Sequence, residues 1–273
     1  MKALQDTDVP VPKMVKLVDE DDSPINRMFF VMEYLDGRIF WDPALSELPV
    51  ENNEERSDIY NAMNASLAAL HNVNIEEVGL SDFGKPGDYF ARQLSRWTQQ
   101  YHASEVDRIE SMHELIDWLE QNLPADDGIV TLVHGDYRLD NMVFDKTQTK
   151  VIGILDWELS TIGHPYADLA YQCMQWRLPN AGSFRGLAGV DRKAIGIPTE
   201  EEYVAQYCKH RGIETIENWP FYVAFSFFRL AAILQGVYKR SLDGNASNPE
   251  KAKSYGAAVP ILSFMAMQMI KEG

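Results

Sequence analysis

Apolar residues spaced three and four positions apart predict three helices in the first half of the chain, over residues 56–71, 89–101 and 109–123. The apolar face of the first helix consists of Ile59, Met63, Leu67 and Leu70. The helical pattern returns at Tyr166 and continues to the end of the chain, apart from an irregular loop over residues 178–198. We therefore expect most of the chain to be helical.

Runs rich in β-branched and aromatic residues predict strands between these helices. Residues 13–18 and 27–34 flank an acidic turn, and we expect them to pair as a hairpin. A short buried strand follows over residues 129–133, and residues 142–144 and 150–155 form a second hairpin. Helices combined with antiparallel strands predict an α+β fold.

The composition is that of an ordinary folded protein, because 45% of the 273 residues are apolar and 24% are charged. The formal net charge of −16 comes entirely from residues 1–130, since residues 131–273 carry 15 basic and 15 acidic side chains. Binders of nucleic acid or of anionic membranes are usually basic, so we expect neither as a partner. The second half of the chain remains compatible with an anionic small molecule.

The amino terminus has no apolar leader segment, and two cysteines, Cys173 and Cys208, are too few for a disulfide framework. Both observations predict a cytoplasmic protein with reduced thiols. One apolar run, residues 221–238, approaches the length of a membrane span but contains Arg229. A charge at the centre of a bilayer costs about 2.5–3.5 kcal/mol or more, so we expect a buried core helix and no membrane span.

Polar residues with potential chemistry gather around the second hairpin. Asn141 directly precedes its first strand and Asp156 directly follows its second strand, so antiparallel pairing brings both residues to one end. Asp136 lies five residues before Asn141, in the loop that enters the hairpin. We therefore expect these three side chains to converge.

Oxygen ligands of this kind suit Mg²⁺, which usually takes one or two protein groups while phosphates and water complete its shell. Asn141 and Asp156 would hold the ion, and Asp136 would accept a proton from a substrate hydroxyl. Each residue alone is an ordinary turn residue, and only the joint spacing indicates phosphoryl transfer. The alternative is a metal-dependent hydrolase that adds His134 and His164, although 29 residues separate the histidines, unlike the short spacing of helix-borne metal sites.

Residues 134–141, followed by Asp156, resemble the catalytic loop and the metal-binding aspartate of protein kinases. The His-Gly-Asp form of the loop is similar to that of the aminoglycoside phosphotransferase and choline kinase group of small-molecule kinases. Residues 154–163, 168–170 and 225–240 resemble, more closely still, the kinase-like domain found beside acyl-CoA dehydrogenase modules. The resemblance extends from about Thr7 to the end of the chain.

This resemblance implies a protein-kinase-like α+β fold with a reduced amino-terminal lobe and a mainly helical carboxy-terminal lobe that contains the catalytic β-hairpin. We place the remnant of the first lobe and the hinge at residues 1–36, and the catalytic and substrate lobe at residues 37–273. The resemblance also implies ATP and Mg²⁺ as cofactors and a small-molecule hydroxyl group as the phosphoryl acceptor.

The resemblance assigns roles to individual residues of the loop and hairpin. Asp136 would be the catalytic base, and Asn141 and Asp156 would hold Mg²⁺. His134 and Asp168 would be structural residues that brace the loop.

Two further roles concern the nucleotide. The backbone carbonyl of Glu33 and the backbone amide of Leu35, in the segment between the lobes, would reach adenine. Arg138 stands two residues after the base, where protein kinases place a lysine near the transferred phosphate, so it is a second catalytic candidate. An exposed or ion-paired arginine is the other interpretation of Arg138.

A working kinase of this class also needs a glycine-rich loop, a strand lysine and a helical glutamate, and none is visible before residue 30. Three explanations are open: a fragment that starts at an internal methionine, a natural truncation that binds without catalysing, or a partner that supplies the missing half. We favour the fragment, and we expect the chain alone to bind ATP weakly and turn over slowly. A two-stranded lobe should expose a sheet edge and apolar surface, which predicts association, including a homo-oligomer.

The loop over residues 177–198 is the candidate substrate loop, and its net charge is +3. Its charged residues are Arg177, Arg185, Asp191, Arg192 and Lys193. The positive sign disfavours a polycationic aminoglycoside and suits an anionic substrate, such as a hydroxylated acyl group on coenzyme A. The resemblance implies the same substrate class, and a solvated surface loop is the plain alternative.

Overall fold

The structure is a computed structural model that describes residues 1–181, 184–245 and 248–272. It divides into two compact units, each built from separate stretches of sequence. Unit 1 comprises Met1–Lys85, Thr131–Ile162 and Gly189–Thr215, and unit 2 comprises Pro86–Val130, Gly163–Ala188 and Ile216–Gly273. The lobe boundary expected between residues 36 and 37 lies within unit 1 and stays a prediction.

Unit 1 combines small antiparallel sheets with helices. Its strands are β1 (Met14–Val18), β2 (Phe29–Met32), β3 (Thr131–Val133), β4 (Met142–Phe144), β5 (Val151–Ile154) and, at its border, β6 (Thr161–Gly163). Its α-helices are α1 (Asn53–His71), α5 (Arg192–Ile195) and α6 (Glu200–Arg211). Its 3-10 helices are η1 (Lys2–Leu4), η2 (Glu20–Asp22), η3 (Leu139–Asn141) and η4 (Trp157–Leu159).

Both hairpins expected from the sequence are present. β1 pairs with β2 so that Leu17 faces Phe30, and β4 pairs with β5 so that Met142 faces Ile154. β3 pairs with β6, a strand that the sequence analysis did not predict. Three residues are too few to show the alternation of apolar and polar positions on which strand prediction rests.

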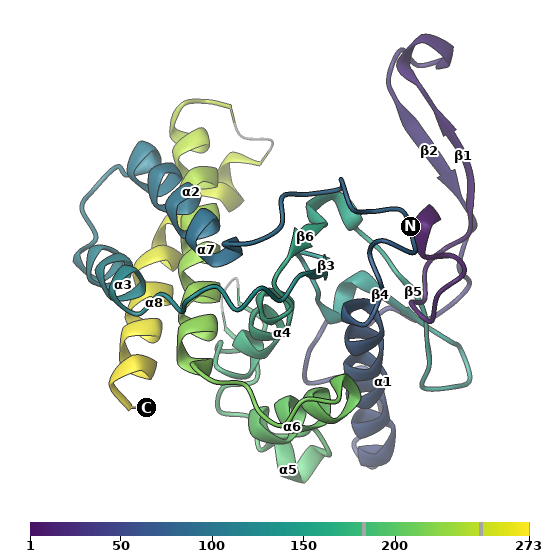
Figure 1. The fold of residues 1–273 in the computed structure, drawn as a ribbon. Helices are drawn as coiled ribbons and strands as arrows, with labels where there is room; N and C mark the ends of the chain where they lie inside the picture. Colours follow the sequence, from purple (N-terminus) through teal and green to yellow (C-terminus); the bar gives the residue numbers. More distant parts are fainter. Residues whose placement is uncertain (182–183, 246–247, 273) are drawn as a thin grey trace. The chain divides into compact units, whose positions relative to one another are not determined.

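The first hairpin carries the exposed apolar surface expected of a two-stranded sheet. Val15, Leu17 and Phe30 are 64%, 62% and 51% exposed, and the hairpin extends from the rest of unit 1 (Figure 1). Among the described residues β1 and β2 pair only with each other, so each strand has an outer edge without a strand partner. Association through this surface stays a prediction.

The second hairpin is held along both outer edges by segments from the amino-terminal part of the chain. The N–H of Ile154 donates to the carbonyl of Pro10 at 2.9 Å, and Arg38 and Phe144 exchange two backbone hydrogen bonds of 2.8 Å each. Gly37 permits this approach, because a Cβ atom there would lie 2.3 Å from the carbonyl oxygen of Phe144. The β4–β5 hairpin is therefore fixed on its two sides.

Helix α1 packs against α6 and supports the hairpin from within unit 1. His71, buried at the end of α1, contacts the Tyr207 hydroxyl through Nδ1 at 2.6 Å, which is a contact typical of a core histidine. Helix α6 begins with a capping box, in which Thr199 and Glu202 each accept the other's backbone N–H. The capping box satisfies two backbone donors that the first turn of the helix would otherwise leave unpaired.

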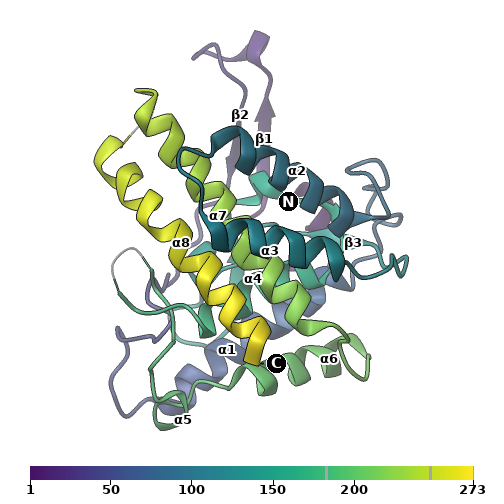
Figure 2. The same ribbon diagram turned by 90° about the vertical axis from the view of Figure 1, so that its left-hand side faces the viewer.

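Unit 2 is helical. Its helices are α2 (Tyr89–Ser104), α3 (Glu110–Gln121), α4 (Tyr166–Cys173), α7 (Trp219–Leu242) and α8 (Pro249–Glu272), with the 3-10 helix η5 (Met174–Trp176) after α4. Helix α7 packs against α2, α3, α4 and α8, and it runs side by side with α8 in Figures 1 and 2. Phe90 of α2 lies 5.7, 4.9 and 5.2 Å from the ring centroids of Phe221, Tyr222 and Phe225 on α7, an aromatic core.

Helix α7 contains the long apolar run of the sequence. It is, in the described part of the chain, the one helix long and apolar enough to cross a membrane, and 72% of its most apolar window is buried. Arg229 is 9% exposed, and its guanidinium lies 5.6 Å from the ring centroid of Tyr171 and 5.9 Å from that of Trp97. These cation–π contacts accommodate the buried charge and favour the core helix that the sequence predicted.

The loop expected over residues 178–198 is more ordered than its sequence indicated, because it contains α5. Asp191 caps this short helix by accepting the N–H of Ala194 at 3.1 Å, and Gly196 ends it with a φ of +77°. One helical turn is too short to produce an apolar period. Residues 182 and 183 of the same loop lie outside the described residues.

Tyr137 anchors the loop before β4 to α1, because it is fully buried and its hydroxyl donates to the carbonyl of Met63 at 2.7 Å. Replacement by phenylalanine keeps the ring but removes this hydrogen bond. We expect Tyr137→Phe to lower the free energy of unfolding by about 0.5–1.5 kcal/mol, as measured by chemical denaturation. Tyr34→Phe, at a site 88% exposed, should change it by less than about 0.5 kcal/mol. Equal losses would contradict the anchoring role.

Candidate active site

The loop between β3 and β4 is braced by the buried side chain of His134. Its Nε2 lies 2.9 Å from the carbonyl oxygen of Leu155, and its Nδ1 accepts the backbone N–H of Asp136 at 3.2 Å. Since Nδ1 is an acceptor, the ring proton lies on Nε2 and is donated to Leu155. The ring thus joins the residue before Asp156 to the backbone of Asp136. Asp168, also expected to brace the loop, is buried in α4 of unit 2.

Gly135 allows the turn between these two residues. Its φ of +87° lies in the left-handed region that residues with a side chain rarely adopt. A Cβ atom at this position would also lie 2.5 Å from the carbonyl oxygen of Leu159. Glycine is therefore required at this position of the His-Gly-Asp sequence both by the backbone conformation and by the lack of space for a side chain.

Asp136 and Asn141 are in direct contact. The amide nitrogen Nδ2 of Asn141 donates to the carboxylate oxygen Oδ2 of Asp136 at 3.0 Å and to its backbone carbonyl at 2.9 Å. Because Nδ2 faces Asp136, the amide oxygen Oδ1 lies on the other side of the group and is the atom available to a cation. This contact places a potential base beside a potential metal ligand.

Asp156 follows β5 at the same end of the hairpin. The N–H of Leu155 donates to the backbone carbonyl of Asn141 at 2.8 Å, so the residue before Asp156 pairs directly with Asn141. Asp156 has a left-handed backbone, with φ 63° and ψ 58°, a conformation often found at functional sites. Its side chain is exposed and forms no hydrogen bond or ion pair with any residue that the structure describes. A carboxylate and an amide oxygen carried at one end of a hairpin are a donor set that fits Mg²⁺.

Arg138 lies between two carboxylates. Its Nε is 3.4 Å from Oδ1 of Asp136, and its Nη2 is 2.9 Å from Oδ2 of Asp140. The arginine is therefore ion-paired in this structure, one of the two interpretations open from the sequence, and its contact with phosphate stays a prediction. Asp140 was not among the predicted site residues, although its charge two positions after Arg138 was a visible signal.

The segment after β2 pairs with Lys13 in an irregular way. The N–H of Glu33 donates to the carbonyl of Lys13 at 2.9 Å, but the N–H of Lys13 donates to the Glu33 side chain at 2.8 Å. The backbone carbonyl of Glu33 is thus not used in this pair. Leu35 packs on β5, because a Cβ atom on Gly153 would lie 2.1 Å from its Cδ1. This segment is attached to the catalytic hairpin, and its contacts with adenine stay predictions.

The hydrolase alternative needs His134 and His164 as ligands of one metal ion, and the structure argues against it. In unit 2, Nε2 of His164 lies 3.2 Å from Asp127, and Nδ1 accepts the N–H of Tyr166 at 3.3 Å. Its ring also stacks on Tyr222 at 5.8 Å. Both ring nitrogens of each histidine are therefore engaged by protein groups.

The basic residues of the expected substrate loop belong to different units. Arg177 and Arg185 are in unit 2, whereas Arg192 and Lys193 are in unit 1. Arg185 and Lys193 are exposed. Each pair contributes positive charge to its own unit, and a role of either pair in substrate binding stays a prediction.

Known sequences that resemble this chain include a phosphotransferase family and parts of longer proteins. The phosphotransferase enzyme family matches residues 1–203 of this chain. Acyl-CoA dehydrogenase family member 10 of Mus musculus is 49% identical over 255 residues, which are 93% of this chain and 23% of that protein. Acyl-CoA dehydrogenase family member 11 of Homo sapiens is 43% identical over 277 residues, which are 99% of this chain and 34% of that protein. The chain thus spans about a quarter to a third of the length of these relatives.

Solved structures share the fold. A Ralstonia eutropha protein assigned as an aminoglycoside phosphotransferase is 46% identical, with a TM-score of 0.92 over 99% of this chain and 81% of that one. A choline/ethanolamine kinase family protein from Mesorhizobium loti has a TM-score of 0.60 over 100% of this chain and 82% of that one, and its 14% identity shows the fold alone. The protein-kinase-like α+β fold implied by the sequence motifs is confirmed.

The position of Gly135 gives a testable consequence. Gly135→Ala adds a Cβ atom against the backbone of Leu159 in addition to the left-handed φ, so we expect it to lower the free energy of unfolding by about 2–5 kcal/mol. Gly79→Ala is the matched control, because Gly79 has a φ of +69° but no atom within 4 Å of the added Cβ, and we expect a loss of about 1–2 kcal/mol. Equal losses in chemical denaturation would show that the contact with Leu159 does not matter.

Proposed function

Because this chain belongs to the phosphotransferase enzyme family, we propose that it transfers the γ-phosphoryl group of ATP to a hydroxyl group of a small molecule, with Mg²⁺ as cofactor. The observation that carries the proposal is the 3.0 Å hydrogen bond from Asn141 to the carboxylate of Asp136, at the hairpin end that also bears Asp156. This end of the hairpin offers one proton acceptor and two oxygen ligands, which is the set that the reaction needs.

Asp136 is the general base in this proposal. Its carboxylate takes the proton of the acceptor hydroxyl, whose oxygen forms a bond to the γ-phosphorus. The bond between that phosphorus and the bridging oxygen breaks, and ADP leaves with the electron pair. Asn141 and Arg138 each contact one oxygen of the Asp136 carboxylate, so they hold the base in one orientation. Such positioning accounts for much of the rate in phosphoryl transfer.

The remaining predicted residues serve the nucleotide. The amide oxygen of Asn141 and the carboxylate of Asp156 would hold Mg²⁺, which when bound neutralises charge on the phosphates. The backbone carbonyl of Glu33 and the amide of Leu35 would bind adenine. Arg138, whose side chain is 38% exposed, would also contact the transferred phosphate.

We propose an anionic acceptor, such as a hydroxyacyl ester of coenzyme A. Two observations support this substrate class: the net charge of +3 over residues 177–198, and the names of the two relatives, which are acyl-CoA dehydrogenase family members. The similar region makes up only 23% and 34% of those proteins, so the acyl-CoA connection reaches this chain as a proposal.

A module that binds Mg-ATP without transferring phosphate is the second candidate function. Within this sequence, the candidate is favoured because β1 and β2 pair only with each other in the described part of the chain and residues 1–29 contain no glycine. A kinase of this class needs a glycine-rich loop to cover the phosphates.

We further propose a cytoplasmic location, and association of copies through the exposed face of β1 and β2.

The proposed roles of the three polar residues predict different defects. Asp136→Asn should keep Mg-ATP binding but lower the rate of phosphoryl transfer by about 10²–10⁴-fold, because the base is lost. Asn141→Ala and Asp156→Ala should instead lose the Mg²⁺-dependent part of ATP binding. Calorimetric titration of ATP with and without Mg²⁺ measures binding, and radiolabel transfer from γ-labelled ATP measures turnover.

Glu158→Gln is the matched control, because Glu158 is exposed and lies two residues after Asp156. It should leave both quantities unchanged. Mg-ATP binding together with equal turnover in the wild type and in Asp136→Asn would favour the binding module. Mg²⁺-dependent ATP binding that persists unchanged in Asn141→Ala and Asp156→Ala would refute the metal site.

The acceptor proposal is tested by charge reversal. Arg185→Glu and Arg192→Glu should each weaken the binding of 3-hydroxyacyl-CoA. The double variant should bind it about tenfold or more weakly, since two attractive charges become repulsive. Lys209→Glu, an exposed reversal on α6, is the control. Unchanged affinity in the double variant, or a preference for choline or an aminoglycoside as acceptor, would overturn the assignment.

A further inference from the structure

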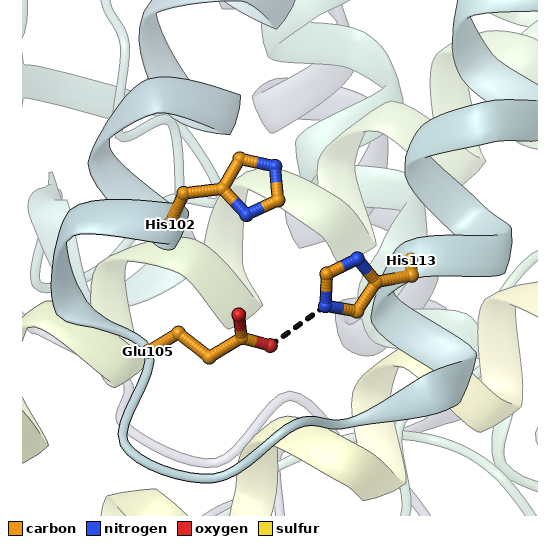
Figure 3. A group of neighbouring side chains, drawn as sticks. All are labelled: His102, Glu105 and His113. Atoms are coloured by element: carbon orange, nitrogen blue, oxygen red, sulfur yellow. Dashed lines mark hydrogen bonds and ion pairs between the residues drawn. The ribbon is translucent and has the colours of Figure 1, made fainter.

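A second group of metal-ligating side chains lies in unit 2, at the corner where α2 leads into α3. His102 is in the last turn of α2, Glu105 follows the helix directly, and His113 is in the first half of α3. One ligand atom from each side chain lies within 4.8 Å of the other two (Figure 3). The group is separate from the Asp136 site, which belongs to unit 1.

The three side chains are arranged around a common point. Nε2 of His113 lies 2.7 Å from Oε1 of Glu105, and the two imidazole ring centroids are 5.4 Å apart. In Figure 3 the second carboxylate oxygen of Glu105 points toward the ring of His102. One oxygen and two ring nitrogens therefore face each other across a small gap at the surface of the corner.

The surroundings of Glu105 favour its ionised form. Tyr101, which is fully buried, donates its hydroxyl to Oε1 at 3.1 Å. Nε2 of His113 and the hydroxyl of Tyr101 both lie within hydrogen-bond distance of this oxygen, an arrangement that suits a negatively charged carboxylate. The neighbouring cation, Arg108, is itself ion-paired with Glu110 at 2.8 Å. A carboxylate in this state is ready to ligate a cation.

We propose that His102, Glu105 and His113 bind one divalent transition-metal ion, with Zn²⁺ as the representative, and that the bound ion fastens the connection between α2 and α3. Two imidazole nitrogens and one carboxylate are a known ligand set of Zn²⁺. Mg²⁺ and Ca²⁺ prefer oxygen ligands throughout, so the two histidines select against them.

Ion entry requires little rearrangement of the three side chains. Tetrahedral ligands with bonds of about 2.0–2.1 Å lie roughly 3.3 Å apart, whereas His113 and Glu105 are now at hydrogen-bond distance. The ion therefore takes the place of the hydrogen between these two atoms, and their separation increases by less than about 1 Å. His102 is exposed, so its ring is free to adjust toward the ion.

Titration of the chelator-treated chain with Zn²⁺ at neutral pH tests the proposal. We expect one ion per chain. We also expect His102→Ala and His113→Gln to bind it at least about tenfold more weakly, because removing even a residue that only hydrogen-bonds to a metal ligand typically costs about 10–100-fold in affinity. Tyr101→Phe should weaken binding less than either ligand variant. The matched control is His210→Ala, because it removes an exposed histidine from α6 of unit 1 and should leave the affinity unchanged.

Thermal unfolding separates metal binding from a folding defect. Zn²⁺ should raise the melting temperature of the wild type and of His210→Ala by the same amount and that of His102→Ala by less, because the stabilisation by a bound ion falls as its affinity falls. His102→Ala is the deciding variant, since an exposed side chain can be removed without disturbing the core. Excess Mg²⁺ should not compete. The proposal would be overturned if the wild type did not bind Zn²⁺. It would also be overturned if His102→Ala and His113→Gln bound Zn²⁺ as tightly as the wild type.

Discussion

The pairing of β4 with β5 is the interaction on which the candidate active site depends. The hydrogen bond from Leu155 to Asn141 closes this pairing at the end where Asp156 begins. A slip of one residue would break this hydrogen bond and turn every side chain of one strand to the other face of the hairpin, since side chains alternate along a strand. Hydrogen bonds to Pro10 and Arg38 occupy the two outer edges, so neighbouring segments of unit 1 hold the register in place.

Asp136 receives its position from several neighbours with different chemistry. His134 accepts its backbone N–H, Asn141 donates to one carboxylate oxygen and Arg138 lies near the other. Gly135 permits the backbone turn that lets these contacts coexist. A base held from several sides is already oriented before the substrate binds, so little conformational freedom is lost at that step. Such pre-orientation favours efficient proton transfer. The same arrangement leaves the amide oxygen of Asn141 directed away from the base.

Elements were predicted correctly from the sequence where the spacing of apolar residues or the geometry of antiparallel pairing defines them. The long helices and both hairpins follow from spacing, and antiparallel geometry was enough to bring Asn141 to the end of the hairpin occupied by Asp156. Features that depend on single rotamers were not visible, such as the pairing of Arg138 with Asp140 or the use of the Glu33 side chain in place of its carbonyl. Spacing also does not encode the angle between α2 and α3, so the histidine and glutamate group at their corner required coordinates.

The cross-strand pair of Leu17 and Phe30 faces solvent on a chain with a net charge of −16. Two forces then act in opposite directions on the colloidal behaviour of the protein. Like-charge repulsion keeps molecules apart in dilute buffer, and added electrolyte shortens its range to about 8 Å at physiological ionic strength. Sulfate or phosphate also strengthens the attraction between apolar faces. We therefore expect salting-out to begin at this hairpin, and the chain to stay dispersed best in dilute buffers without sulfate or phosphate.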